Sequence, residues 1–191
     1  VYEKHVLKKI IEFSKKGNYP FIDIGAADGY FAIGMAFSKI FKKIYAFEID
    51  ERGRKSLNRN IENNLCKDKV VVDIEANFET LKEIVDKNKS AVILIDIEGS
   101  EFDLLDNKLL KLLSNCYIVC ELHPALSANG FEKQNMLINN AKAFFDVSII
   151  QRESYSPNKF SELNEFTDEE RLIAFGEGRE NNMNWLILEP K

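Results

Sequence analysis

The sequence of 191 residues has little of what builds a disulfide framework, a zinc site or a membrane span. Three cysteines and two histidines occur, with no CxxC pair, so the ligands of a structural zinc site are missing. The longest apolar runs are far shorter than the roughly 20 residues that cross a bilayer. Residues 1–10 carry charges throughout, which disfavours a signal peptide. We therefore expect a cytoplasmic protein with reduced, buried thiols and no membrane partner.

Charge and composition argue against two further classes of protein. The net charge of −5 does not favour a broad surface for nucleic acid or anionic lipid. A content of 45% hydrophobic and 30% charged residues is typical of a globular protein, not of a disordered chain. This length suits one domain, 1–191, which buries about 70% of its unfolded surface without a disulfide or metal.

Short apolar runs alternate with longer amphipathic ones along the chain. The runs predict strands at 21–25, 44–47, 69–74, 91–95, 117–121, 145–150 and 184–188, and helices at 3–16, 28–41, 51–64, 78–86, 100–113 and 131–143. A break near 106–107 is the alternative to a continuous helix at 100–113. Strands that are apolar on both faces and alternate with helices indicate a parallel sheet covered on both sides. The carboxyl ends of these strands meet at one edge, where such folds bind ligands.

A polar excursion at 151–182 interrupts this alternation. Within it, Thr167 and Glu170 form a capping box that predicts a short helix ending near Phe175. Long excursions at the ligand edge of a compact domain are often functional. We interpret this one as a lid or an acceptor-binding element, and the alternative is a surface loop that is tolerated at little cost.

A glycine loop follows the first predicted strand and opens a helix. Residues 23–30 read Asp-Ile-Gly-Ala-Ala-Asp-Gly-Tyr, with Ala27 and Tyr30 where the dinucleotide fingerprint needs glycine. No GK[ST] follows, which argues against a phosphate-binding loop of the Walker type. The loop suits a ligand with a carboxylate and an amine, because backbone N–H groups at the N-terminus of the helix can bind the carboxylate and Asp23 can bind the amine.

An acid ends the second predicted strand. Glu48 can accept hydrogen bonds from both hydroxyls of a ribose, and the alternative is a solvated charge at a strand end. Its pairing with the glycine loop favours the ribose. Asp50 or Glu51 is interpreted as a helix cap.

Three motifs together resemble a known family. FIDIGAADGYFAIGMA at 21–36 and YAFEID at 45–50 resemble the first two motifs of class I S-adenosylmethionine-dependent methyltransferases. IDIEGSE at 95–101, followed by FDLL, resembles the D-[IV]-E-G-x-E stretch of FkbM-type methyltransferases, which are mostly O-methyltransferases of sugars and natural products. The resemblance covers residues 21–124. It implies a Rossmann-like, doubly wound, mostly parallel seven-stranded sheet with the last strand antiparallel.

The resemblance also implies a cofactor and the residues that bind it. S-adenosylmethionine would be held by residues at the strand ends: Asp23, Gly25, Ala26, Asp28, Gly29, Tyr30, Glu48, Ile49, Ala76 and Asp96. Contacts to the adenine ring are expected near Ala76, at the end of the third strand, with Ile49 against the ring or in the core.

The acceptor end of the site is expected after the fourth and fifth strands. Asp96, Glu98, Glu121 and His123 lie there, and these strands are expected neighbours. His123 titrates near neutrality and is the candidate base for a hydroxyl, although a loop histidine without a role is the alternative. Asp96 would face the cofactor's amine or the reacting hydroxyl, with Glu98 and Glu121 in support. Glu101 is interpreted as a possible helix cap.

The same four residues could bind a divalent metal. Catechol-type, metal-dependent O-methyltransferases carry Asp-Asn or Asp-Asp after strand five, whereas this chain reads Glu-Leu-His. We therefore favour a site without metal.

The leading hypothesis is transfer of a methyl group from S-adenosylmethionine to a hydroxyl of a small molecule, a sugar or natural product. Amino-group methylases of DNA carry Asn/Asp-Pro-Pro-Tyr/Phe after strand four, but this chain has Asp-Ile-Glu-Gly, which disfavours a nucleic-acid acceptor. Two alternatives stay open: a methyltransferase of the same fold acting on protein or RNA, and a cofactor-binding module without turnover.

Overall fold

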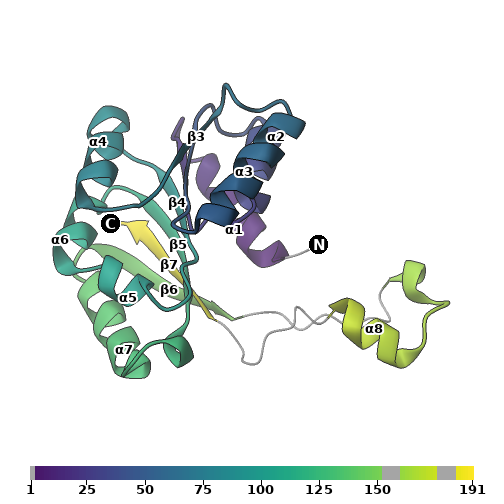
Figure 1. The fold of residues 1–191 in the computed structure, drawn as a ribbon. Helices are drawn as coiled ribbons and strands as arrows, with labels where there is room; N and C mark the ends of the chain where they lie inside the picture. The colour runs from purple at the N-terminus through teal and green to yellow at the C-terminus, as the bar shows by residue number, and fades with distance from the viewer. Residues whose placement is uncertain (1–2, 152–159, 176–183) are drawn as a thin grey trace.

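The computed structural model describes residues 3–151, 160–175 and 184–191, which contain one seven-stranded sheet (Figure 1). Its strands are β1 Phe21–Ile24, β2 Ile44–Phe47, β3 Val70–Asp73, β4 Val92–Ile95, β5 Tyr117–Leu122, β6 Phe145–Gln151 and β7 Asn184–Pro190. The spatial order is β3-β2-β1-β4-β5-β7-β6. Strands β1 to β5 pair in parallel, and β7 is antiparallel to both β5 and β6. The predicted Rossmann-like, mostly parallel sheet with an antiparallel last strand is confirmed.

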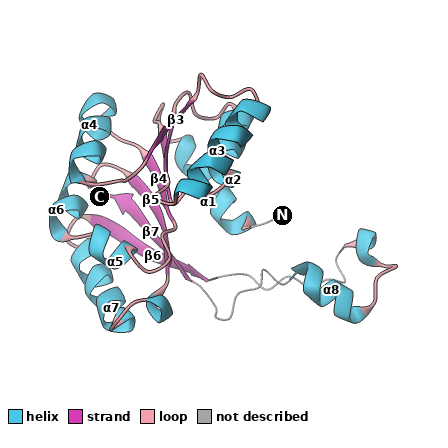
Figure 2. Ribbon diagram, viewed as in Figure 1, coloured by secondary structure: helices cyan, strands magenta, loops and turns pink. Residues whose placement is uncertain are grey.

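Helices cover both faces of the sheet (Figure 2). On one face lie α1 Lys4–Ser14, α2 Tyr30–Ser38 and α3 Glu51–Asn63, and on the other α4 Phe78–Asn88, α5 Glu101–Leu104, α6 Asn107–Leu112 and α7 Gly130–Ala141. The 3-10 helix η1 Pro124–Leu126 connects β5 to α7. None of the helices within the described residues is long and apolar enough to cross a membrane.

The sheet separates two hydrophobic cores because side chains alternate along a strand. In β1, Ile22 and Ile24 belong to the core under α4 to α7, whereas Phe21 belongs to the core under α1 to α3. By this alternation, Asp23 lies on the same side as Phe21 and α2. The cysteines are all free and buried, as expected.

Helix boundaries agree with the predicted caps and differ where the backbone turns left-handed. Asp50 caps α3 by accepting a hydrogen bond from the Gly53 N–H at 2.7 Å. The predicted helix at 28–41 is shorter, because Gly29 (φ +98°) and Lys39 (φ +60°) bound α2. The predicted helix at 100–113 divides into α5 and α6, with Asp106 as the cap of α6.

The polar excursion is described in part. Helix α8, Asp168–Phe175, follows the 3-10 helix η3, Ser161–Leu163, and lies apart from the sheet in Figure 1. The expected capping box is present, because the Thr167 N–H donates to Glu170 Oε2 at 2.8 Å and the Glu170 N–H donates to Thr167 Oγ1 at 3.3 Å. Residues 152–159 and 176–183 lie outside the described part, so the role of the excursion as a lid stays a prediction.

Candidate functional site

The glycine loop after β1 lies directly against the end of β4. Gly25 has φ +89°, and a Cβ atom built on it would lie 1.8 Å from the backbone oxygen of Asp96. The Asp96 N–H donates to the Ile24 oxygen at 2.9 Å, which fixes the same approach. Only glycine fits this backbone conformation and this contact. The glycine at this position therefore allows the loop after β1 to pack against the backbone that follows β4.

Backbone N–H groups of the loop are used within the protein. Gly25 and Ala26 both donate to the Phe47 oxygen at 2.9 Å, and Gly29 donates to the Ala26 oxygen at 2.8 Å. Ala27 donates to the Glu48 carboxylate. The prediction that N–H groups at a helix N-terminus bind a ligand's carboxylate is not tested by these bonds and stays a prediction. The first turn of α2, whose N–H groups lack partners within the helix, is where a carboxylate can bind.

Asp23 is buried, and one of its carboxylate oxygens is open. Its side chain is 2% exposed, and Oδ2 has no hydrogen-bond partner among the described residues. Burial, together with the charges of Asp96 and Glu48, raises the pKa of Asp23 to about 7, against a smaller opposing effect of the Ala32 N–H. A cation bound beside Oδ2 would reverse this shift. The predicted role of Asp23 in binding an ammonium group stays a prediction.

Glu48 joins the end of β2 to the glycine loop. Its Oε2 accepts a hydrogen bond from the Ala27 N–H and its Oε1 accepts one from the Asp50 N–H, each at 2.7 Å. With only 9% of the residue exposed, the alternative of a solvated strand-end charge is wrong. Each carboxylate oxygen keeps room for a second donor, so a role in binding a ribose stays a prediction.

The other predicted cofactor residues differ in exposure. Ala26 is buried and Ala76 is half-buried, whereas Asp28 is exposed. Tyr30 is 48% exposed and Ile49 is 74% exposed. Ile49 therefore lies outside the core, which leaves its apolar surface available for a planar ring.

Two residues of α3 that the sequence analysis missed hold these segments in place. Arg54 Nη1 donates to the oxygens of Glu48 at 2.8 Å and Ile49 at 2.6 Å. Asn60 Nδ2 donates to the Asp28 oxygen at 2.9 Å. Their partners are backbone oxygens, so no residue pattern in the sequence could have identified them.

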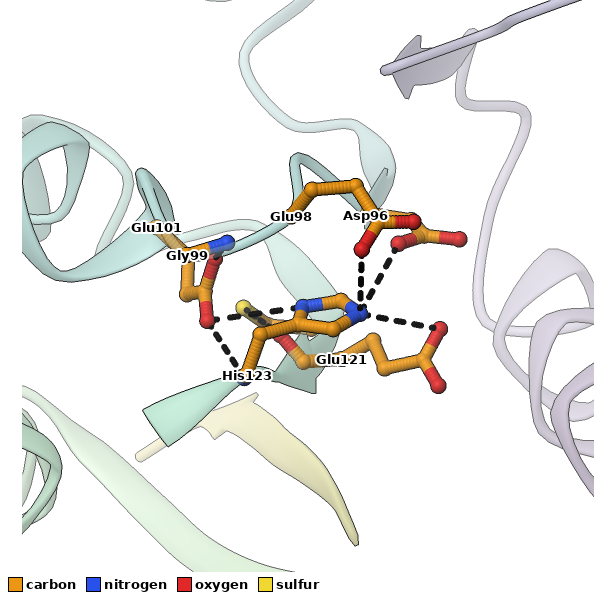
Figure 3. Close-up of polar contacts among 7 residues, drawn as sticks. Asp96, Glu98, Gly99, Glu101, Glu121 and His123 are labelled. Atoms are coloured by element: carbon orange, nitrogen blue, oxygen red, sulfur yellow. Dashed lines mark hydrogen bonds and ion pairs between the residues drawn. The ribbon is translucent and has the colours of Figure 1, made fainter. Parts of the chain in front are cut away.

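Four predicted residues meet at the carboxyl ends of β4 and β5 (Figure 3). His123 Nε2 lies 3.5 Å from Asp96 Oδ1, 3.6 Å from Glu98 Oε2 and 3.8 Å from Glu121 Oε2. The Glu98 backbone has φ +51°, a left-handed conformation that costs an ordinary residue about 1–2 kcal/mol. The ends of β4 and β5 thus place three carboxylates around one ring nitrogen.

A fifth residue, Glu101, lies on the opposite side of the imidazole. Its Oε1 accepts a hydrogen bond from the His123 backbone N–H at 2.6 Å and is 3.5 Å from His123 Nδ1. Its Oε2 accepts one from the Gly99 N–H at 2.8 Å. The interpretation of Glu101 as a helix cap is wrong, because Ser100 is the N-cap of α5.

The charges of this cluster shift the pKa values of both central groups. Burial by itself lowers the pKa of His123, but the Glu101 carboxylate 3.5 Å from Nδ1 and the charges of Asp96 and Glu98 outweigh it and raise the pKa. Burial by itself raises the pKa of Glu101, but the adjacent His123 imidazole and the hydrogen bond from the His123 backbone N–H lower it overall. The pair therefore favours an ionised carboxylate beside a basic imidazole.

The cluster has the donor types of a divalent-metal site. One ligand atom each from Asp96, Glu98 and His123 lies within 4.8 Å of the others. Carboxylate oxygens with one imidazole nitrogen suit Mg²⁺ or Mn²⁺ and several transition metals. A metal there would use the same Nε2 lone pair that a general base needs, so the two uses exclude each other.

A hollow of about 340 Å³ begins at the residue after His123. Its lining combines a small apolar surface with polar groups from η1 and the start of α7: Pro124, Ala125, Ser127, Asn129, Gly130, Phe131 and Glu132. Phe131 is 66% exposed. A pocket of this size, with an aromatic ring and several hydrogen-bonding groups, suits a small polar molecule.

No family model and no curated protein matches the sequence. Solved structures with the same fold include the precorrin-6y C5,15-methyltransferase of Geobacter metallireducens, at 13% identity and a TM-score of 0.63, over 100% of this chain and 90% of that one. An rRNA methylase of Streptococcus thermophilus is similar at 9% identity and a TM-score of 0.60, over 98% and 95% of the two chains. A precorrin 8w decarboxylase of Methanobacterium thermoautotrophicum is similar at 17% identity and a TM-score of 0.59, over 98% and 90%.

At these identities the similarity concerns the fold alone. This chain has the Rossmann-like fold that methyltransferases share. The names of the similar proteins include a precorrin methyltransferase, an rRNA methylase and a precorrin decarboxylase, so the fold does not determine the acceptor. The acceptor has to be argued from the site.

Proposed function

We propose that this protein is an S-adenosylmethionine-dependent methyltransferase that methylates a hydroxyl group of a small molecule, a sugar or natural product. One observation supports this most. The glycine loop after β1, which carries an open buried carboxylate at Asp23, contacts the segment after β4, and that segment faces His123. A site for a cationic ligand and a candidate base are therefore adjacent at one edge of the sheet. Membership of the FkbM-type family is part of the proposal.

The residues of the loop fit this cofactor. Asp23 would bind its ammonium group through Oδ2, and Glu48 would bind its ribose. Gly25 leaves no space for a side chain between the loop and Asp96, so the floor of the site is backbone. When bound, S-adenosylmethionine supplies a methyl group activated by a positively charged sulfur.

The chain's own residues provide the acid–base chemistry. His123 would accept the proton of the acceptor hydroxyl at Nε2, which leaves an imidazolium. Asp96, Glu98, Glu121 and Glu101 surround that ring and stabilise its positive charge. General-base assistance of this kind contributes about 10²–10⁴-fold to the rate. The hollow beyond His123, with Phe131 and polar neighbours, would hold the acceptor.

Calorimetric titration with S-adenosylmethionine and S-adenosylhomocysteine tests the cofactor site. We expect micromolar affinity, weakened about tenfold or more in Glu48→Ala, because hydrogen bonds to a charged acceptor contribute about 1.5–3 kcal/mol and 1.4 kcal/mol is tenfold. The matched control is Glu62→Ala, an exposed acid of α3, which should bind like the parent protein. Failure of the folded protein to bind either compound would overturn the proposal.

A second step tests the acceptor. Hydroxylated metabolites, RNA and proteins are offered with labelled cofactor, and we expect transfer to a hydroxylated small molecule. Transfer to RNA or protein would contradict the proposed acceptor class but not the cofactor site. Cofactor binding without transfer to any acceptor would assign the chain as a binding module. Circular dichroism of each variant excludes loss of fold, because Glu48 also anchors the Ala27 N–H.

A further inference from the structure

We infer that Glu101 is a positioning residue of the site: its buried carboxylate holds His123 so that Nδ1 carries a proton and Nε2 faces the acceptor. The inference rests on the proposed function of His123 as the base. In the proposed site, Glu101 itself contacts neither the cofactor nor the acceptor. It acts through the imidazole, as the third member of an acid–histidine–hydroxyl arrangement.

Two backbone contacts single out Glu101 from Glu121, the other fully buried carboxylate of the cluster. Glu101 is 0% exposed, and both of its oxygens accept backbone hydrogen bonds from the loops that follow β4 and β5. The two donors, Gly99 and His123, belong to loops that only the pairing of β4 with β5 brings together. One side chain therefore fixes the backbone on both sides of the site.

Within the described residues, His123 is the group in ion-pair distance of Glu101 that can carry positive charge. A side chain that only accepts hydrogen bonds from two backbone N–H groups does not need a net charge. Burying a carboxylate without a counter-charge is strongly unfavourable. The negative charge is explained if the Nδ1 proton of His123 compensates it. A proton held on Nδ1 leaves Nε2 as the nitrogen that takes up or releases protons.

The ionisable groups around the ring are consistent with a proton held on Nδ1 and exchanged at Nε2. Asp96, Glu98 and Glu121 face Nε2, and Glu98 and Asp96 have side chains exposed by 73% and 26%. Water therefore weakens the effect of the Asp96 and Glu98 charges, whereas Glu121 beside Nε2 and Glu101 beside Nδ1 are both shielded from solvent. Cys120 lies nearby, but burial raises the pKa of its thiol well above the usual value, so it adds no charge.

The chain has only two histidines, so imidazole spectra give a direct test without cofactor or acceptor. Long-range ¹H–¹⁵N correlation reports which ring nitrogen carries the proton. The variant His5→Gln removes the other signal, since His5 lies on α1 against Trp185 and outside the site. We expect neutral His123 to be protonated at Nδ1. An Nε2–H form in the parent protein would overturn the inference, whether or not any variant folds.

Substitution separates positioning from a merely structural role. In Glu101→Gln we expect the midpoint of His123 titration to fall by about 1 pH unit or more, since a neighbouring charge shifts a pKa by about 1–3 units. Glu101→Asp, which keeps the charge, should restore most of this midpoint. An unchanged midpoint in Glu101→Gln would refute the inference.

Turnover gives a second readout. We expect Glu101→Gln to lower kcat at least tenfold, to move the acidic limb of the pH profile downward with the His123 midpoint, and to leave cofactor affinity within twofold. If the protein binds no S-adenosylmethionine, the proposed function fails while the spectra still report on Glu101. If it binds and transfers but the spectra show no effect of Glu101, only this inference fails.

Discussion

Replacing the Asp23 carboxylate by an amide should make the protein more stable and less able to bind its cofactor. The folded protein holds Asp23 buried, with Oδ2 open and a pKa raised from 3.8 to about 7. Ionising it in the folded state therefore opposes folding. The variant Asp23→Asn removes the ionisable group and keeps nearly the same shape.

The magnitude follows from the two pKa values. Below about pH 4, both the folded and the unfolded chain carry the proton, and the carboxyl group does not oppose folding. Between pH 4 and 7 only the folded state keeps it, so the free energy of unfolding of the parent falls by about 1.4 kcal/mol per pH unit. Above pH 7 both states are ionised and the loss is complete. Over about 3 pH units it reaches roughly 4 kcal/mol.

Urea denaturation from pH 4 to 8 measures this difference, and the single tryptophan, Trp185, is 1% exposed in β7 and reports unfolding. We expect Asp23→Asn and the parent to be similar near pH 4 and to differ by roughly 4 kcal/mol at pH 8. The control is Asp68→Asn, which replaces an exposed acid. The difference in free energy of unfolding between this variant and the parent should not vary with pH. A difference for Asp23→Asn that is constant from pH 4 to 8 would refute the reasoning.

Two further predictions concern the loop and the metal question. Gly25→Ala should destabilise the protein by at least about 1–3 kcal/mol through its positive φ alone, and by more because the new Cβ would collide with the Asp96 backbone oxygen. It should also abolish cofactor binding. Gly34→Ala in α2, where a Cβ meets nothing within 4 Å, should instead stabilise the protein by about 0.5–1 kcal/mol. Thermal denaturation compares the two, and equal effects would contradict this account. Because we assign His123 Nε2 to proton transfer, turnover should survive chelation with EDTA; activity lost on chelation and restored by Mn²⁺ would assign Asp96, Glu98 and His123 to a metal instead.

The parts of the fold that could be predicted depend on local pattern. Short runs such as Val92–Ile95 are buried on every residue, so their composition alone predicts parallel strands. Chain order then places Asp96 and His123 at neighbouring strand ends, which the register of β4 with β5 bears out. Asp50 and Thr167 could be predicted as cap residues, because their partners lie three residues away.

The parts that could not be predicted depend on contacts between distant segments. Glu101 has the local features of a cap, yet one of its acceptor bonds reaches His123, 22 residues away. The same holds for the glycine loop, where the Phe47 oxygen of β2 takes the N–H groups of Gly25 and Ala26. A residue pattern identifies which groups can donate or accept, but the partner is chosen by how the strands pack.

The position of β7 has a consequence for how the chain is made. β7 lies between β5 and β6, and among the described residues β6 pairs with β7 alone. On the ribosome, β5 and β6 are therefore synthesised well before the strand that joins them. Until Asn184–Pro190 emerges, both present unpaired edges, which are sites for non-native association. The nascent chain should thus become resistant to proteases only after Asn184–Pro190 has emerged, and truncation before residue 184 should yield aggregated protein.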